Sequence, residues 1–547
     1  MLKKIFLLLI TLFISMTVPV YSYDSETPIR VGISDTNFST YTFTKEEFYS
    51  NGKLKITDSS TGESFQTENE VITVEMQNKL FKVYKGKDLK ITQTRGPIVI
   101  APEQGFLIGI KNHSRVGKPA FYRGIIELTP AKNKENGYAI VNILDLQNYL
   151  KGVVPNEMPV SFGLEALKAQ CIAARNYALR PRNKFYEEFD ICDSVACQVY
   201  FGAKTEKELS NKAVEETDGL VALYNGALIL AVYSSTAGGY TESHANAFSD
   251  PNSKKFPGKD IPYLQARPDI PDMKNLSEEK DAREFYSSKP DTFDNNSPYF
   301  RWTREWTLSE FIKMLNTTML EQKAFIKPDF NENSKFEKIQ EIKIKQRGQS
   351  GKVMFLEIYT ENGVYTVGKE LTIRRLFKKD GKALPSANFI CDIVKDGNSN
   401  EPKIKFTGGG FGHGVGLSQY GAGKMAQSGL NFVSILQHYY TGISIGTIPI
   451  TVSSQYGKNN AFQSFFSPKR KAEIVVDEIK GLNEITVIIN GIETDIDFGK
   501  FFKKSRINID KYIKKGKNTI EYNIPADYYG QKQIKLHVEI EGANDND

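Results

Sequence analysis

The stretch NYLKGVVPNEMPVSFGLEALKAQCIAARNYAL, from Asn148 to Leu179, places an acid among apolar neighbours and prolines, close to a helix. Glu157 stands between Pro155 and Pro159, with valines and a methionine around it. From Leu164 onward, apolar residues recur at helical spacing, and Ser161 is the expected N-cap of that helix. The stretch therefore predicts a core helix with one carboxylate just before its start.

Two interpretations of Glu157 follow from these residues. An acid near a helix N-terminus is stabilised by the unpaired N–H groups and by the helix dipole, so Glu157 can be a capping group. Apolar neighbours would instead raise its pKa and keep it protonated near neutral pH, as a general acid requires. The two effects oppose each other, and both interpretations stay open at this point.

The size and charge of the chain indicate how many domains it has and which kinds of partner it can bind. With 547 residues the chain exceeds the size of one hydrophobic core, so we expect two or three domains. The formal net charge of +6 is dispersed and forms no basic stripe, which argues against nucleic-acid binding. A mild positive balance suits an anionic surface such as a cell wall.

The N-terminus has the pattern of an export signal. Lys3 and Lys4 precede an apolar run from Ile5 to Val18, and small or polar residues follow near Ser22. That run is shorter than the roughly 20 residues of a membrane-spanning helix. We expect residues 1–22 to be a signal peptide or an N-terminal anchor, and the protein to be extracytoplasmic, at the cell wall or tethered to the membrane.

The remaining pattern predicts an α+β fold with a mixed, β-rich core and a few helices. Residues 28–144 contain short β-branched runs and form the β-rich N-terminal part of the core. Residues 145–450 mix helices and strands, with a surface insertion near 250–297. Residues 453–547 alternate apolar and polar positions, which predicts a small β-sandwich that folds independently and is dispensable for chemistry.

A glycine-rich loop and a hydroxyl-rich segment present further candidate side chains. In TGGGFGHGVGLSQYGAG the glycines allow close approach of a ligand, and the loop presents His413, Gln419 and Tyr420. The alternative for His413 is that it satisfies a backbone group. In YSSTAGGYTES, Tyr233 and Ser235 follow a strand, but no nucleophile-elbow pattern supports a serine hydrolase.

The segment DICDSVACQVYFG holds two of the four cysteines of the chain. Cys192 and Cys197 could ligate zinc with His244, although a zinc site usually has four ligands. A short-range disulfide, or two thiols, is the alternative. We expect the two cysteines to lie close together and to steady their loop, by a metal ion or by a disulfide. If neither is present, they are inert thiols.

Together these motifs resemble those of the stage II sporulation protein D and amidase-enhancer family. The resemblance rests on YLKGVVPNEMP, EALKAQCIAARNYAL, CDSVACQVYFG, AVYSSTAGGYTES and GFGHGVGLSQYGAGKMAQSG in this order. It implies an exported lytic transglycosylase that cleaves peptidoglycan between MurNAc and GlcNAc and leaves 1,6-anhydro-muramoyl ends, with Glu157 as the catalytic residue. The sugar contacts that we expect are His413, Gln419, Tyr420, Tyr233, Ser235, Arg175 and Tyr177.

The resemblance implies no required cofactor, and zinc would be structural. Members with a zinc site tend to carry His directly before the second cysteine, where this sequence has Ala196. The implied setting is sporulation or cell-wall remodelling, with a cell-wall amidase or membrane proteins of an engulfment complex as partners.

Two alternatives remain. The first is a non-catalytic wall-binding protein that enhances an amidase. The second is a hydrolase that uses a further acid, Asp190 or Asp193, because most glycosidases need two carboxylates.

Overall fold

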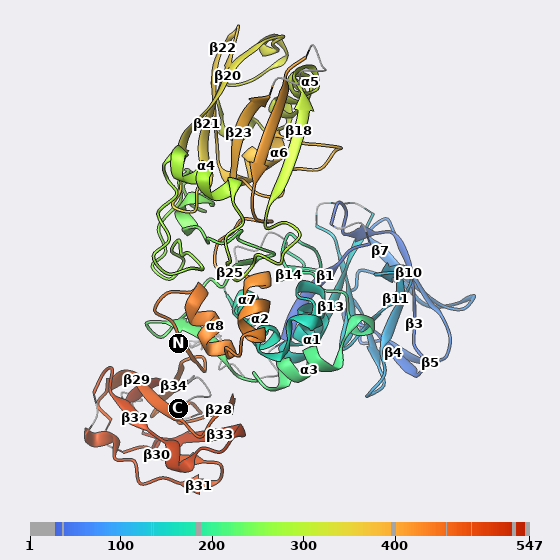
Figure 1. Cartoon of the computed structure of the whole chain (residues 1–547). Coiled ribbons are helices and arrows are strands. Elements are labelled where there is room, and N and C mark those ends of the chain that lie inside the picture. Colours follow the sequence, from blue (N-terminus) through green and yellow to red (C-terminus); the bar gives the residue numbers. More distant parts are fainter. Residues whose placement is uncertain are drawn as a thin grey trace, which may run out of the picture.

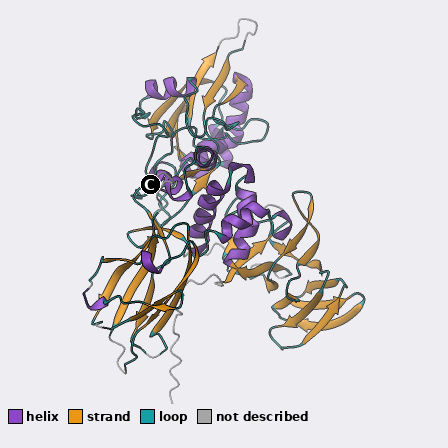
Figure 2. Ribbon diagram, turned by 60° about the horizontal axis from the view of Figure 1, so that its bottom comes forward, coloured by secondary structure: helices purple, strands orange, loops and turns teal. Residues whose placement is uncertain are grey.

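The computed structural model describes residues 28–541, apart from 36–37, 133, 135, 181–186, 395–400, 456, 483, 501 and 528–531. The expected signal peptide or anchor at residues 1–22 lies outside the described residues. Strand-rich parts lie around a central group of helices, and Figure 2 shows these helices gathered in the middle. The predicted α+β class is confirmed. No helix in the described ranges has the length and apolar character needed to span a membrane.

The N-terminal part consists of two sheets (Figure 1, blue and cyan). Their orders are β14-β1-β13-β12-β9-β4-β5, with β2 paired to β13, and β11-β10-β3-β6-β7-β8. The strands are β1 (Pro28–Ile33), β2 (Thr42–Phe43), β3 (Lys45–Tyr49), β4 (Lys53–Asp58), β5 (Ser64–Glu68), β6 (Ile72–Gln77), β7 (Leu80–Lys85), β8 (Asp88–Thr94), β9 (Ile98–Pro102), β10 (Ile108–Arg115), β11 (Lys118–Tyr122), β12 (Ile125–Pro130), β13 (Tyr138–Asp145) and β14 (Ile191–Cys192). In β4 the buried Leu54 and Ile56 alternate with exposed lysines, which is the period of a strand with one buried face. The short β14 pairs in parallel with β1 and so fixes the cysteine segment to this sheet.

The helical centre begins directly after β13. It contains α1 (Leu146–Glu157), α2 (Leu164–Leu179), α3 (Glu208–Glu215), α7 (Gln419–Gln427) and α8 (Phe432–Tyr439). Asp145 caps α1 by accepting a hydrogen bond from the Asn148 N–H. Helix α2 is buried from Ala166 to Asn176, and its alanines let the neighbouring helices approach closely. The predicted N-cap of α2 at Ser161 is wrong, because a 3-10 turn occupies Val160–Phe162 and Gly163, with φ of 96°, precedes the helix.

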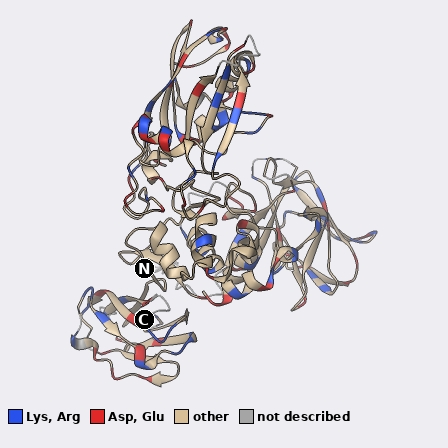
Figure 3. Ribbon diagram, in the orientation of Figure 1, with Lys and Arg blue, Asp and Glu red and all other residues tan. Residues whose placement is uncertain are grey.

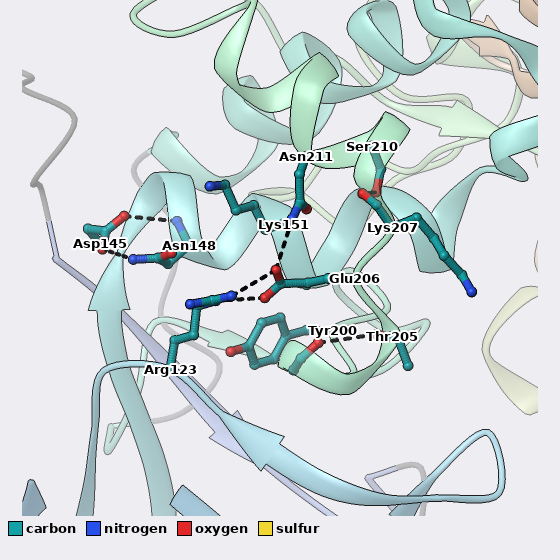
Figure 4. Close-up of polar contacts among 12 residues, drawn as sticks. Arg123, Asp145, Asn148, Lys151, Tyr200, Thr205, Glu206, Lys207, Ser210 and Asn211 are labelled. Carbon is teal, nitrogen blue, oxygen red and sulfur yellow. Dashed lines mark hydrogen bonds and ion pairs between the residues drawn. The ribbon is translucent and has the colours of Figure 1, made fainter. Parts of the chain in front are cut away.

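Polar contacts fix α1 and α3 against the N-terminal sheets (Figure 4). Arg123 donates two hydrogen bonds to Glu206, at 2.7 and 3.0 Å, and Asn211 donates to the same carboxylate at 3.0 Å. This bidentate pair joins the turn before β12 to the segment that leads into α3. Asn156, near the C-terminal end of α1, donates to Thr205 Oγ1 of the same segment at 2.8 Å, which holds that end of the helix in place.

Short strands complete the centre. They are β15 (Val221–Tyr224), β16 (Ala227–Leu228), β17 (Tyr233–Ser234), β25 (Leu417–Ser418) and β26 (Ser444–Gly446). β17 and β25 pair in parallel, with Tyr233 opposite Leu417 and Ser234 opposite Ser418. This pairing brings the hydroxyl-rich segment beside the glycine-rich loop.

An inserted unit, residues 250–416 at the top of Figure 1, lies between these two strands in the sequence. It contains α4 (Glu279–Ser287), β18 (Trp302–Thr307), α5 (Leu308–Glu321), β19 (Ile326–Lys327), β20 (Ile339–Arg347), β21 (Val353–Thr360), β22 (Gly363–Gly368), α6 (Glu370–Leu376), β23 (Phe389–Val394) and β24 (Lys403–Gly408). Residues from Trp302 to Phe406 form a hydrophobic core of their own, in which Phe389 stacks on Phe406 with ring centroids 4.5 Å apart. The expected insertion at 250–297 is therefore too short. The strands after residue 297 belong to the hydrophobic core of the inserted unit and not to the core of the helical centre.

The C-terminal part contains β27 (Ile450–Ser453), β28 (Asn460–Ser467), β29 (Ala472–Lys480), β30 (Thr486–Ile489), β31 (Ile492–Glu493), β32 (Arg506–Asn508), β33 (Gly516–Asn523) and β34 (Gln533–Ile540). One of its sheets has the order β16-β15-β26-β34-β29-β32, so β34 pairs directly with β26 of the centre. The shared sheet contradicts the expected independence of this part. Figure 3 shows Lys and Arg interspersed with Asp and Glu along the chain, in agreement with the absence of a basic stripe.

We expect a chain that ends after Ser453 to lose its cooperative fold, because it lacks β34 and leaves the buried Ile445 on an open sheet edge. Thermal unfolding and size-exclusion chromatography measure this effect. A chain that ends after Glu541 is the control and should behave as the parent. A Ser453 truncation with the unfolding midpoint of the parent would contradict the shared-sheet account.

Candidate active site

Glu157 is the last residue of α1, and donors from distant parts of the chain surround it. Its Oε1 accepts a hydrogen bond from the Val199 N–H at 2.6 Å, and its carboxylate also accepts one from the Tyr233 side chain. The Gln419 side chain donates to the Glu157 backbone carbonyl at 2.9 Å. Three sequence-predicted motifs therefore meet at one acid. The capping interpretation is wrong, because Glu157 is the last residue of α1 and its donors, Val199 and Tyr233, do not belong to α2.

Burial raises the pKa of Glu157 to about 7, and the hydrogen bonds from Val199 and Tyr233 lower it only in part. The place of Glu157 in the last turn of α1 also disfavours its ionised form, since the carbonyl end of a helix is negative. The side chain remains partly accessible to solvent. A carboxyl group with this pKa can both donate and accept a proton at neutral pH.

Tyr233 and Gln198 form a relay that orients the proton of the phenol. Tyr149 donates to Gln198 Oε1 at 3.0 Å, and Gln198 Nε2 donates to the Tyr233 hydroxyl oxygen at 3.0 Å. Because this oxygen accepts from Gln198, the proton of Tyr233 is free to point at Glu157. Burial raises the pKa of Tyr233 well above its usual range, which keeps the phenol protonated. The sequence interpretation missed Gln198, although it stands directly after Cys197 in the cysteine motif.

Cys192 and Cys197 lie together, as predicted, with their sulfur atoms 2.7 Å apart. His244 lies elsewhere: its Nδ1 faces the Lys259 carbonyl oxygen at 3.2 Å, and its ring stacks on Phe248. Across the described part of the chain, no three His, Cys, Asp or Glu side chains gather as a metal ion needs. The cysteine pair therefore does not fit a zinc site with His244. The pair instead brings the two ends of the segment 192–197 together, directly before Val199.

The glycine-rich loop lies against β17. A Cβ atom on Gly412, whose φ is 105°, would come within 2.8 Å of the Ser234 Cβ, so only glycine fits there. His413 Nδ1 accepts from the Val415 N–H at 3.1 Å, as the backbone alternative predicted. Burial and the nearby Lys352 and Arg374 lower the pKa of His413 to about 3, so its imidazole is neutral.

The other predicted contacts divide into two groups. The Tyr420 ring packs on Phe162 at 4.9 Å, and its N–H donates to the Ser235 carbonyl at 3.0 Å, next to Gln419. Tyr177 lies close enough to Tyr233 to raise its pKa. These residues belong to the site.

Arg175 does not belong to the site. It is fully buried, and its guanidinium donates to the Leu220 carbonyl at 2.8 Å. The interpretation of Arg175 as a sugar contact is therefore wrong.

A buried carboxyl group, Asp294, ties the two site strands together. Its Oδ2 accepts from Thr236 Oγ1 at 2.5 Å, from the Gly238 N–H at 2.8 Å and from Ser418 Oγ at 3.2 Å. Thr236 and Gly238 follow β17, and Ser418 ends β25. Asp294 falls in the stretch that the sequence indicates is a surface excursion, so no pattern pointed to it.

The candidate second acids have other partners. Asp193 forms an ion pair with Arg115 at 2.6 Å and accepts from the Ser34 N–H. Asp190 accepts from the Arg30 N–H at 3.3 Å. Among the described residues, no second acid acts on the pKa of Glu157. The site thus contains one carboxyl group with two hydrogen-bond donors, and no paired acids.

Comparison with known proteins places this fold and site in a class related to the bacterial cell wall. The family profile described as "Stage II sporulation protein" matches residues 134–224, and a domain of unknown function matches residues 250–416. The stage II sporulation protein D of Bacillus subtilis (strain 168) is 30% identical over 56% of this chain and 75% of its own length. That of Bacillus amyloliquefaciens is 29% identical over 59% of this chain and 80% of its own length.

The amidase enhancer of Bacillus subtilis (strain 168) is 31% identical over 54% of this chain. This match spans only 40% of the enhancer's own length. The chain belongs to the stage II sporulation protein D and amidase-enhancer family. The matched residues 134–224 include Glu157, both cysteines of the pair and Gln198.

We expect Asp294→Ala to lower the free energy of unfolding by about 2–3 kcal/mol, because three buried donors lose their acceptor. Denaturant unfolding measures the change. The exposed neighbour Asp291→Ala is the control and should stay within about 0.5 kcal/mol of the parent. Equal stability of the two variants would contradict the proposed role of Asp294 in holding the residues next to β17 and β25 together.

We expect Cys192 and Cys197 to be oxidised to a disulfide in protein purified without reductant, because their sulfur atoms are adjacent and no described His, Cys, Asp or Glu completes a metal site with them. Alkylation of the unfolded, unreduced protein followed by peptide mass spectrometry should leave this pair unmodified. Cys171 and Cys391 serve as internal controls and should be alkylated. One equivalent of bound zinc in elemental analysis would overturn the expectation.

Proposed function

We propose that this protein is a lytic transglycosylase that cleaves peptidoglycan glycan strands between MurNAc and GlcNAc, with Glu157 as acid and then base. The observation that carries the proposal is the buried Glu157 carboxyl group, whose pKa is raised to about 7. Family membership supports a role at the cell wall, in sporulation or wall remodelling. Its substrate lies outside the cytoplasm, in line with the export signal that the sequence predicts.

In the first step Glu157 donates its proton to the glycosidic oxygen, and the bond from that oxygen to the anomeric carbon of MurNAc breaks. At neutral pH a large fraction of Glu157 carries the proton that this step needs. The Val199 N–H, at 2.6 Å from Oε1, holds the carboxyl group in place.

In the second step the Glu157 carboxylate accepts the proton of the 6-hydroxyl of the same MurNAc. The O6 atom bonds to the anomeric carbon, so the product is a 1,6-anhydro-muramoyl end, Glu157 regains its proton, and no water is consumed. The protonated phenol of Tyr233 stabilises the carboxylate between the steps. One acid is sufficient for this cycle, in contrast to hydrolysis, which usually needs two.

The surrounding groups hold the acid and contact the sugar. Gln419 fixes the Glu157 backbone, and Gln198 fixes the Tyr233 hydroxyl. Tyr420, Ser235, Tyr177 and the neutral His413 are the proposed sugar contacts. Asp193 is engaged by Arg115, which argues against its use as a second catalytic acid.

A non-catalytic, wall-binding enhancer of a cell-wall amidase is the second candidate function. The observation in its favour is the 31% identity to a protein named amidase enhancer. An amidase, or membrane proteins of an engulfment complex, would then be partners. Release of anhydro sugars by the purified protein alone distinguishes the two functions.

We expect Glu157→Gln to lower the rate of anhydro-product release by about 10²–10⁴-fold, because the side-chain amide of glutamine is not acidic enough to protonate the glycosidic oxygen. Mass spectrometry of products from glycan with and without stem peptides measures the rate and identifies the substrate. Glu208→Gln, on the exposed face of α3, is the matched control and should keep the parent rate. A folded Glu157→Gln protein that cuts at the parent rate would end the catalytic assignment in favour of wall binding.

A further inference from the structure

An exposed aromatic ring stands on the glycine-rich loop beside the candidate active site. Residues 408–412 read GGGFG, so Phe411 is the only side chain beyond hydrogen that this part of the loop presents. Its ring is 39% exposed. An exposed phenylalanine lacks part of the stabilisation that burial would supply. Single exposed rings are common on protein surfaces, so what distinguishes Phe411 is its rigid position next to the residues around Glu157.

The Phe411 ring has a fixed position. It packs against Tyr299 of the inserted unit with ring centroids 4.5 Å apart and an interplanar angle of 33°. The backbones of Phe411 and Thr236 exchange two hydrogen bonds, at 2.9 and 3.3 Å, and the Gly410 N–H donates to the Tyr299 carbonyl at 2.8 Å. Both rings are therefore held by backbone contacts that do not depend on the ligand.

The pair is continuous with the site of Glu157. Thr236, which pairs with Phe411, is three residues after Tyr233, which contacts the Glu157 carboxylate. Three residues span at most ~11 Å of backbone, so a glycan strand that passes Glu157 and continues by further sugars reaches the Phe411 ring. The adjacent glycines leave the loop free of side chains that would keep a polymer away.

We propose that Phe411 and Tyr299 form a glycan-binding subsite. A pyranose ring of the strand that reaches Glu157 packs its C–H face on the exposed Phe411 ring, while Tyr299 supports that ring from the inserted unit. The identity of the ligand rests on the proposed function. The flat, partly exposed ring with a rigid support matches the apolar face of a sugar, which has hydroxyl groups only around its edge.

The test uses the full chain with Glu157→Gln, so that glycan is not consumed, and calorimetric titration with MurNAc–GlcNAc oligomers of two and eight sugars. We expect Phe411→Ala to weaken binding of the octasaccharide roughly tenfold and to leave the disaccharide unchanged. Phe411→Trp should restore binding. Phe462→Ala is the control and should have no effect, because Phe462 is a phenylalanine on β28 that is even more exposed, at 48%.

The outcomes separate this subsite from the proposed reaction. Parent-like binding of both oligomers by a folded Phe411→Ala protein would overturn the subsite, even if the parent releases anhydro sugars. The same holds if Phe411→Ala changes only self-association in size-exclusion chromatography. If Phe411→Ala weakens octasaccharide binding while the parent with intact Glu157 releases no product, the subsite stands and the proposed reaction falls. Absence of glycan binding by the parent would overturn both.

Discussion

The structure depends on how one carboxyl group, that of Glu157, is held away from bulk water. Its hydrogen-bond partners come from the cysteine segment through Val199, from β17 through Tyr233, and from the start of α7 through Gln419. These segments are far apart in the sequence, and two sheet contacts bring them to the acid: β14 of the cysteine segment pairs with β1, and β17 and β25 of the other two segments pair with each other. Burial that raises the pKa of Glu157 to about 7 is thus a property of the whole centre of the fold.

The inserted unit is part of this arrangement and not an appendage. Its Asp294 binds the residues that follow β17 and the residue that ends β25, and its Tyr299 supports the ring of Phe411 on the glycine-rich loop. Its Lys352, which is fully buried, helps to keep His413 neutral. The C-terminal part is attached in a similar way, since β34 continues a sheet of the centre. The inserted unit therefore supports the site directly, and the C-terminal part is joined to the same centre through β26.

The sequence predicted what depends on local pattern. Helix α2, the role of the glycines near Gly412 and the proximity of Cys192 and Cys197 follow from spacing and residue type, whereas the meeting of the motifs around Glu157 was implied by the family resemblance. It could not show pairing between distant strands, so the second core and the shared β26–β34 sheet were missed. Polar residues whose partners are far away in sequence were also misjudged: Arg175 is a buried structural donor, whereas Gln198 and Asp294 hold the site.

The central claim is that Glu157 is a carboxyl group with a strongly raised pKa, and its titration tests this claim most directly. Carbon-13 NMR of the native protein labelled at glutamate side chains, with the Glu157→Gln spectrum to assign the signal, gives the midpoint. The account predicts a midpoint of about 7, well above the ordinary value of 4.5, because burial outweighs the hydrogen bonds from Val199 and Tyr233. A Glu157 signal that titrates at the ordinary value would contradict the account.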